Sequence, residues 1–65
     1  MLTVNVETAN FRDGPSTKND VVYTADKYYT VEVLAKKKDW VKTRDFEGDV
    51  AWVAARLLEK TTAVV

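Results

Sequence analysis

The complete absence of cysteine and histidine most constrains this chain, because a 65-residue sequence has few other means of holding a fold together. Without thiols there are no disulfide bridges, and without thiols or imidazoles the usual ligands of structural zinc sites are missing. Catalytic Ser-His and Cys-His pairs are excluded for the same reason. A domain of this size buries only roughly 60% of its unfolded surface, so its stability depends on a well-patterned apolar core.

Charge and hydropathy exclude two classes of partner. Ten Lys and Arg residues balance ten Asp and Glu residues, and a balanced chain is poorly suited to gripping a nucleic-acid backbone. The longest apolar run, Val50 to Ala55, is far shorter than the ~20 residues that cross a bilayer. We therefore expect no nucleic-acid partner and no membrane insertion. No signal peptide is recognisable at the N-terminus, so we expect any export signal to have been removed or to lie outside this sequence.

Short β-rich runs separated by polar turns dominate the sequence. The clearest is Tyr29 to Ala35, in which Tyr29, Val31, Val33 and Ala35 share one face. Ala54 to Leu58 has helical composition over about one turn, which predicts a 3₁₀ turn. Strands are predicted over residues 3–6, 21–24, 29–35, 40–45 and 50–53, with residues 10–12 extended into a loop and a possible last strand over 59–62.

The turns are marked by the few chain breakers. Gly14 and Pro15 lie in a long polar loop over residues 13–20, residues 36–39 form a charged turn, and residues 46–49 form a tight hairpin with Gly48 as the expected positive-φ position. Aspartates at such turns commonly accept hydrogen bonds from nearby backbone N–H groups. We therefore expect the turn carboxylates to be structural, with no metal site and no catalytic pair.

This pattern predicts an all-β fold, a small SH3-like bent barrel of five to six short strands with one 3₁₀ turn near the C-terminus. A five-stranded oligonucleotide-binding barrel is the alternative, but it usually needs longer strands. We expect the barrel to span residues 1–62 and residues 63–65 to be a frayed tail or the start of a linker. The predicted core consists of Val4, Val6, Ala9, Phe11, Val22, Val31, Val33, Val41, Ala51, Val53 and Leu58.

Three motifs, in order along the chain, resemble those of bacterial SH3 domains. They are the Ala9–Thr17 segment ANFRDGPST, the Asp39–Arg44 segment DWVKTR, and the ending formed by Gly48, Trp52-Val53 and Leu57-Leu58. Residues 44–49 are also similar to a subgroup found in exported proteins of Gram-negative bacteria. The resemblance implies a strongly bent barrel in which residues 13–20 correspond to the RT loop, 36–39 to the n-Src loop and 46–49 to the distal hairpin.

The two tryptophans are the most informative side chains for function. Trp40 and Trp52 alternate away from the core-facing valines of their strands, so we expect an outward-facing aromatic strip. Such strips are enriched at binding sites because rings offer large, rigid contact area. The alternative is that each ring covers a barrel end or packs on a lysine stem. The loop lacks the tyrosines of eukaryotic proline-rich-peptide grooves, so that ligand class is not expected.

The resemblance implies a non-catalytic recognition or targeting module of a larger exported bacterial protein, with a periplasmic location and without cofactors. Its ligand would be a peptide or a peptidoglycan fragment held in a shallow aromatic groove. The alternative is a structural adaptor that packs against another domain. We expect a monomer and no enzymatic activity. The candidate ligand-binding residues are Trp40, Trp52, Asp13, Lys36, Lys37 and Lys38, with Trp40 as the platform, the lysines attracting carboxylates and Asp13 attracting amines.

The adjacent pair Tyr28 and Tyr29 opens the third predicted run. Because neighbouring side chains in a strand alternate, one of the two must face solvent or a loop. We expect the pair to pack at the strand start, under the 13–20 loop.

Overall fold

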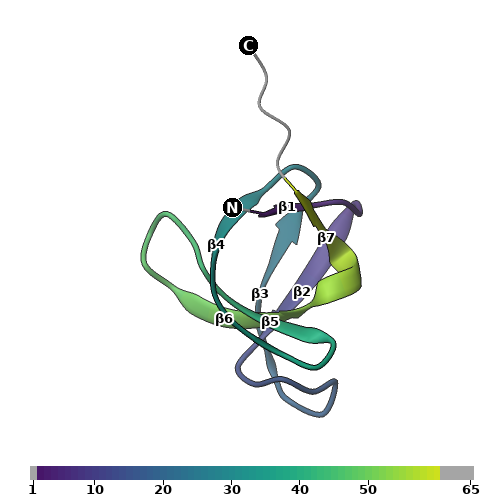
Figure 1. Ribbon diagram of the computed structural model, residues 1–65, viewed down its shortest axis with the longest axis vertical. Helices are drawn as coiled ribbons and strands as arrows, with labels where there is room; N and C mark the ends of the chain where they lie inside the picture. Colours follow the sequence, from purple (N-terminus) through teal and green to yellow (C-terminus); the bar gives the residue numbers. More distant parts are fainter. Residues whose placement is uncertain (1, 61–65) are drawn as a thin grey trace.

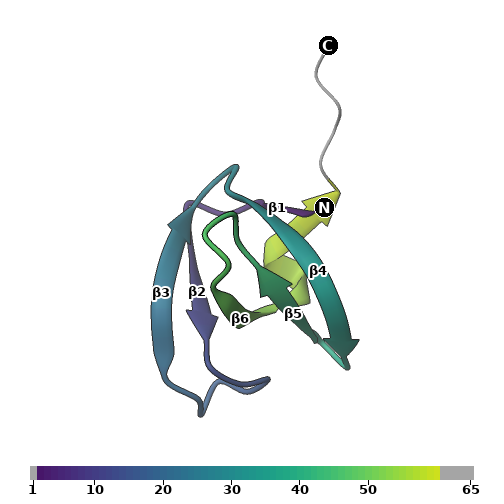
Figure 2. The same ribbon diagram turned by 90° about the vertical axis from the view of Figure 1, so that its left-hand side faces the viewer.

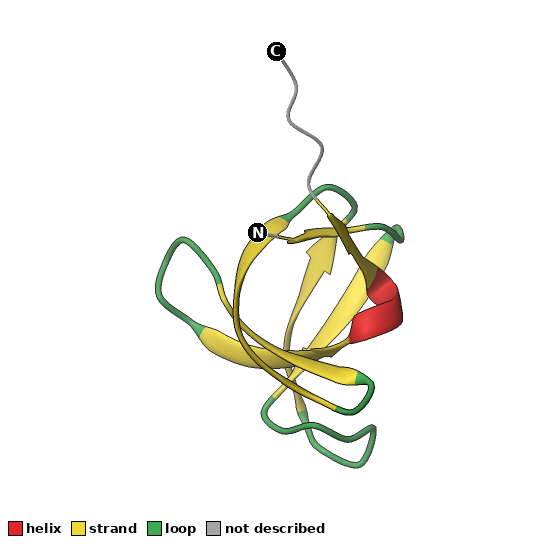
Figure 3. Cartoon of the chain, viewed as in Figure 1, coloured by secondary structure: helices red, strands yellow, loops and turns green. Residues whose placement is uncertain are grey.

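The computed structural model describes residues 2–60, which form one strongly curved antiparallel sheet (Figures 1 and 3). The strands follow the spatial order β3-β2-β6-β5-β4-β1-β7, and the sheet coils into a small bent barrel. The predicted all-β class and the 3₁₀ turn are confirmed. The elements are β1 (Leu2–Val4), β2 (Thr8–Arg12), β3 (Val21–Asp26), β4 (Thr30–Lys37), β5 (Trp40–Arg44), β6 (Val50–Ala54), the 3₁₀ turn η1 (Ala55–Leu57) and β7 (Leu58–Lys60).

The described residues contain seven strands, where the sequence predicted five to six. The additional strand is β2, whose residues were expected to be an extension into the loop. Every residue of β2 pairs with β3, and Arg12 also pairs with Trp52 of β6, which makes this segment part of the sheet. The predicted tail at residues 63–65 lies outside the described residues, so that boundary stays a prediction.

The core lies inside the barrel and is built from alternate residues of nearly every strand. Phe11 is fully buried, and its ring stacks on that of Tyr23 with centroids 4.8 Å apart. Burial of one such side chain stabilises the fold by roughly 1.5–3 kcal/mol. Eight predicted core residues are buried: Val4, Ala9, Phe11, Val31, Val41, Ala51, Val53 and Leu58.

The prediction for Val22 is wrong, because its side chain is 52% exposed. The pairing of β2 with β3 shifts between Phe11, which faces Tyr23, and Arg12, which faces Val21. Tyr23 and Ala25 face Phe11 and Ala9 of the core, so alternation places Val22 on the outer face, and the bulge at Val22 turns Val21 outward as well. A change of one residue in register moves every side chain of a strand to its other face.

The outer half of β4 also departs from the prediction. Val33 pairs with Thr43 but Ala35 pairs with Lys42, so Leu34 is bulged out of the ladder and is 43% exposed. Val33 is half-buried against the core, and Ala35 is exposed. Beyond the bulge the strand extends past the core, which explains why strict alternation fails there. Val6 is likewise only half-buried against the core.

Candidate functional site

The two tryptophans lie on the same outer face of β5 and β6. Trp40 faces Ala54 across the ladder and Lys42 faces Trp52, so the rings are diagonal neighbours, a spacing of about 7–8 Å in regular sheets. Both rings are half-buried, while Val53 beside them on β6 points into the core. We call the surface formed by Trp40, Trp52 and the lysine and arginine side chains around them the tryptophan face.

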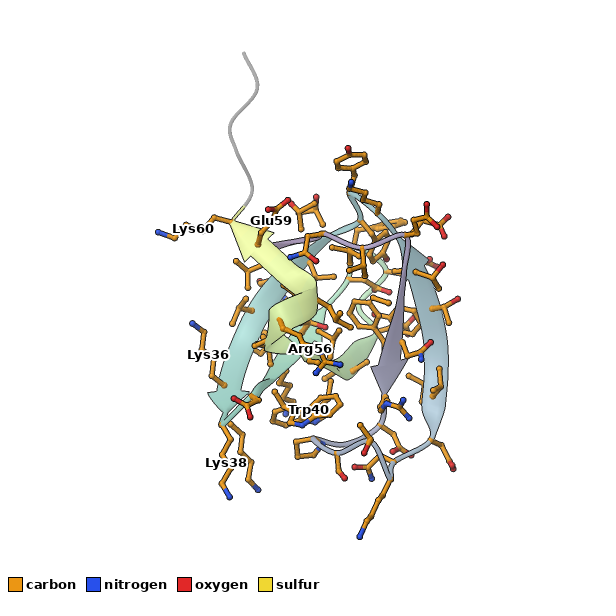
Figure 4. All side chains as sticks on the ribbon, turned by 90° about the vertical axis from the view of Figure 1, so that its right-hand side faces the viewer. Lys36, Lys38, Trp40, Arg56, Glu59 and Lys60 are labelled. Atoms are coloured by element: carbon orange, nitrogen blue, oxygen red, sulfur yellow. The ribbon has the colours of Figure 1, made fainter. Side chains whose placement is uncertain are left out.

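Trp40 lies where three segments meet. Figure 4 shows its ring between Arg56 of η1 and the 13–20 loop, with Lys36 and Lys38 to one side. The Ala55 N–H donates to the Asp39 carbonyl at 2.7 Å, which ties η1 to the turn that precedes β5. This hydrogen bond holds η1 next to the start of β5, where Trp40 lies.

The 13–20 loop is held in place from its base. The Arg12 guanidinium donates to the carbonyls of Thr17, at 3.2 Å, and Asn19, at 3.0 Å. Gly14 is needed for close approach, since a Cβ there would lie 2.5 Å from the Asn19 side chain. Asp13 is exposed at the start of this loop, so its carboxylate is open to a ligand. The loop gives the tryptophan face one well-ordered wall.

The three lysines of the charged turn are all exposed, but they do not point the same way. Lys37 faces Trp40 across the hairpin and shares its side of the sheet, whereas Lys36 faces Val41 and so belongs to the opposite side. Lys38 occupies the tip with a φ of 54°, which is uncommon for a residue other than glycine. The structure thus places Lys37 and Lys38 beside Trp40 and turns Lys36 away.

Three further cations adjoin the tryptophans and were missed by the sequence reasoning. Lys42 and Arg12 flank Trp52 across the two ladders, and Arg56 lies near Trp40 because η1 is hydrogen-bonded to Asp39. Because side chains alternate along a strand, the sequence alone could have placed Lys42 on the same face as Trp40. The approach of Arg56 depends on the direction of η1, and no local pattern encodes that direction.

A second aromatic region lies at the other end of β5, where an open groove of about 840 Å³ follows β3. We call it the tyrosine groove. One wall is residues 22–29, and the other is the turn after β5. The groove is lined by four carboxylates and one lysine, namely Asp26, Asp45, Glu47, Asp49 and Lys27.

Asp45 organises the turn that forms one wall of this groove. Its Oδ1 accepts the N–H groups of Glu47 and Asp49, each at 2.9 Å, and its side chain is buried. Gly48 follows with a φ of 89°, as predicted. The expectation that turn aspartates accept hydrogen bonds from local backbone is confirmed for Asp45, so this carboxylate is occupied structurally.

The two tyrosines nearest to Asp45 are shifted in acidity. Burial, followed by the charge of Asp45, raises the pKa of Tyr23 to about 12. Burial, followed by the charge of the Asp45 carboxylate, also raises the pKa of Tyr29. The Tyr23 hydroxyl is buried beside Thr43 without a well-formed hydrogen bond to a described residue. Both shifts reflect a region that disfavours additional negative charge.

The tyrosine pair does not pack under the 13–20 loop as expected. Tyr29 packs against the core and tilts toward Phe46 of the β5–β6 turn, with centroids 6.3 Å apart. Tyr28 is 72% exposed, has a φ of 76°, and carries the Lys27 ammonium 5.3 Å from its ring centroid. One of the two rings faces solvent, as expected, but both tyrosines lie in the turn before β4 and line the tyrosine groove.

Among residues 2–60, no group of three or more metal-ligating side chains is arranged to hold an ion. The same part of the chain contains no helix long and apolar enough to span a bilayer.

Comparison with known proteins gives one match. No curated protein and no solved structure matches the chain. Residues 7–59 match the family described as bacterial SH3 domain, whose members are generally non-catalytic binding modules. The matched range contains β2 to β6, η1, the 13–20 loop and both tryptophans. With most of its length covered and the bent all-β barrel in place, the chain belongs to the bacterial SH3 domain family.

Proposed function

We propose that this domain is a recognition module of a larger exported bacterial protein, and that its tryptophan face binds a carboxylate-bearing peptide such as the peptide part of a peptidoglycan fragment. The observation that carries the proposal is the half-buried pair Trp40 and Trp52 on one outer face, surrounded by cations from four segments. Rings supply a rigid apolar platform, while ammonium and guanidinium groups attract carboxylates.

The roles divide according to position. Trp40 is the platform, because the 13–20 loop and η1 flank it. Lys37 and Lys38 contact the ligand's carboxylates, and Lys36 contributes only at longer range because it lies on the other side of the hairpin. Asp13 attracts a ligand amine from the loop edge. Trp52 extends the platform between Lys42 and Arg12.

A titration with a disaccharide-tripeptide from peptidoglycan, followed by amide and indole NMR signals, tests this proposal. We expect shifts at the indole N–H of Trp40 and at the amides of Lys37 and Lys38. Trp40→Ala should weaken binding by roughly 2 kcal/mol, as for an aromatic anchor. Phe46→Ala is the matched control, because this ring is 83% exposed at the other end of β5 and should leave affinity unchanged.

The same peptide with amidated carboxylates should bind more weakly, because the lysines then lose their charged partners. Unchanged signals around Trp40 with both the fragment and a periplasmic extract would contradict the proposal and favour an adaptor that packs on another domain. A ligand of this kind lies outside the cytoplasm, so fusion of the native precursor to a reporter that is active only after export should give activity.

A further inference from the structure

We propose a second binding surface, separate from the tryptophan face: the free edge of β3 and the tyrosine groove take up an extended, lysine- or arginine-rich peptide segment of a partner protein as an added β-strand. Figure 2 shows β3 at the margin of the sheet, and in the strand order β3 has β2 as its only neighbour among the described strands. Such an edge presents unpaired backbone groups to an incoming chain.

The hydrogen-bond pattern identifies which backbone groups are free. The Lys27 N–H donates to the Glu7 carbonyl at 3.3 Å, in the same register that pairs Ala25 with Ala9. Bonded pairs alternate along an antiparallel ladder, so Ala25 faces β2 and Thr24 directs its N–H and carbonyl away from it, into the groove. Asp26, paired with Thr8 two residues further along, directs its backbone groups the same way and extends this free edge by one more position.

Edge strands usually carry lysine or proline residues that prevent pairing with another chain, and β3 lacks both. Its side chains at Val21 and Val22 are 43% and 52% exposed. Val50 across the groove is 48% exposed as well. These apolar side chains give an added strand something to cover beyond the backbone bonds.

The charge of the groove selects the partner. Asp45 is occupied by the turn, but Asp26, Glu47 and Asp49 are exposed along the two walls. The single lining lysine, Lys27, lies over the Tyr28 ring. An extended strand with cations at alternate positions would set its charges against these carboxylates while its backbone pairs with Thr24.

The same charges disfavour a second copy of this chain as the occupant. Antiparallel pairing of one β3 edge with another would bring Asp20 of one copy close to Asp26 of the other. Like charges that face each other across a ladder are destabilising. A basic segment of another protein avoids this repulsion between aspartates.

A peptide titration tests the proposal with the probe acetyl-Lys-Val-Lys-Val-Lys-amide. We expect shifts at the amides of Val22 and Thr24, slower hydrogen exchange of the Thr24 amide, and no response from acetyl-Glu-Val-Glu-Val-Glu-amide. A probe N-methylated at alternate residues keeps its charge but loses strand-pairing donors, and it should bind about tenfold more weakly. Equal binding of the methylated probe would overturn strand addition.

Three variants separate the contribution of the strand edge from that of the groove's charge. Thr24→Pro deletes the outward N–H without removing a β2–β3 bond and should reduce affinity, whereas Thr24→Ala retains the donor and should bind normally. Glu47→Gln with Asp49→Asn should weaken the basic probe at low salt. If Thr24→Pro does not fold, the methylated probe decides the question on the native chain.

Other outcomes refute the proposal directly. Shifts confined to the tryptophan face, or loss of probe binding in Trp40→Ala, would place the basic peptide elsewhere. Concentration-dependent dimerisation that broadens the Thr24 signal without any peptide would identify a second copy as the occupant. Because the tests use different probes and residues, failure here leaves the peptidoglycan proposal unaffected.

Discussion

The tryptophan face and the tyrosine groove lie at opposite ends of β5, and they differ mainly in the charge that surrounds similar rings. Lys37, Lys42 and Arg56 adjoin the tryptophans, while Asp26, Glu47 and Asp49 surround the tyrosines. The net charge of zero hides this division. The two proposed binding surfaces therefore differ in the charge of the ligand that each would take.

The two regions also differ in how their side chains are held. Trp40 is flanked by a loop and a 3₁₀ turn that are fixed by backbone and arginine hydrogen bonds. The tyrosine groove is bounded on one side by an unpaired strand edge. A preformed platform suits a small rigid fragment, whereas an open edge suits a segment that becomes ordered as it binds.

The largest expected effect separates surface from core on β5 and β6. Val53 is fully buried, so Val53→Ala should lower the free energy of unfolding by about 1–3 kcal/mol through lost burial and a residual cavity. Trp40→Ala should cost less than about 1 kcal/mol if the ring is a surface platform. Thermal melting of both variants makes the comparison. If Trp40→Ala melts as low as Val53→Ala, the ring is structural and the binding proposal loses its main support.

The inner face of the barrel could be predicted well where strands are regular. On β5 and β6 alternation placed Val41, Ala51 and Val53 correctly in the core, and it placed both tryptophans outside. The spacing of polar and apolar residues is sufficient there to predict which face each side chain occupies, because the ladder between the two strands runs without a bulge.

Prediction failed where the register changes or where distant segments meet. The bulges beside Val22 and Leu34 shift the alternation by one residue, and no residue type nearby marks them. The tyrosine groove joins residues 22–29 to a turn about twenty residues later, and the approach of Asp45 to Tyr29 depends on barrel closure. Local sequence patterns carry no information about such contacts.

A smaller effect is expected at the turn that bounds the tyrosine groove. Gly48 has a φ of 89°, and a Cβ built there has no atom within 4 Å, so Gly48→Val is strained by its backbone alone. We expect a loss of roughly 1–2 kcal/mol in unfolding free energy. Urea denaturation measures it, with Gly48→Asn as a milder control because asparagine tolerates this conformation. Binding of the peptidoglycan fragment should be retained; its loss would show that the turn and the tryptophan face are coupled.

The smallest effect at neutral pH, and the most specific, concerns the ionisation of Tyr23. A folded-state pKa of about 12 against an ordinary value of 10.0 means that the folded chain keeps this proton over a range where the unfolded chain loses it. Stability is therefore complete below about pH 10 and falls as the pH rises toward 12. Tyr23→Phe should flatten that fall, leaving the weaker contribution of Tyr29, whose pKa is raised for the same reasons. At pH 7 the free energy of unfolding of the variant should differ from that of the native chain by less than about 0.5 kcal/mol, since the change removes a buried hydroxyl that lacks a well-formed hydrogen bond.

Urea midpoints measured between pH 7 and 12 test this prediction for Tyr23. Trp40→Phe is the matched control, because an aromatic change on the tryptophan face removes no ionisable group. Parallel pH curves for Tyr23→Phe and the native chain would show that neither burial nor the carboxylates of the groove raise the pKa of this ring, and the electrostatic contrast between the two regions would then rest on the surface charges alone.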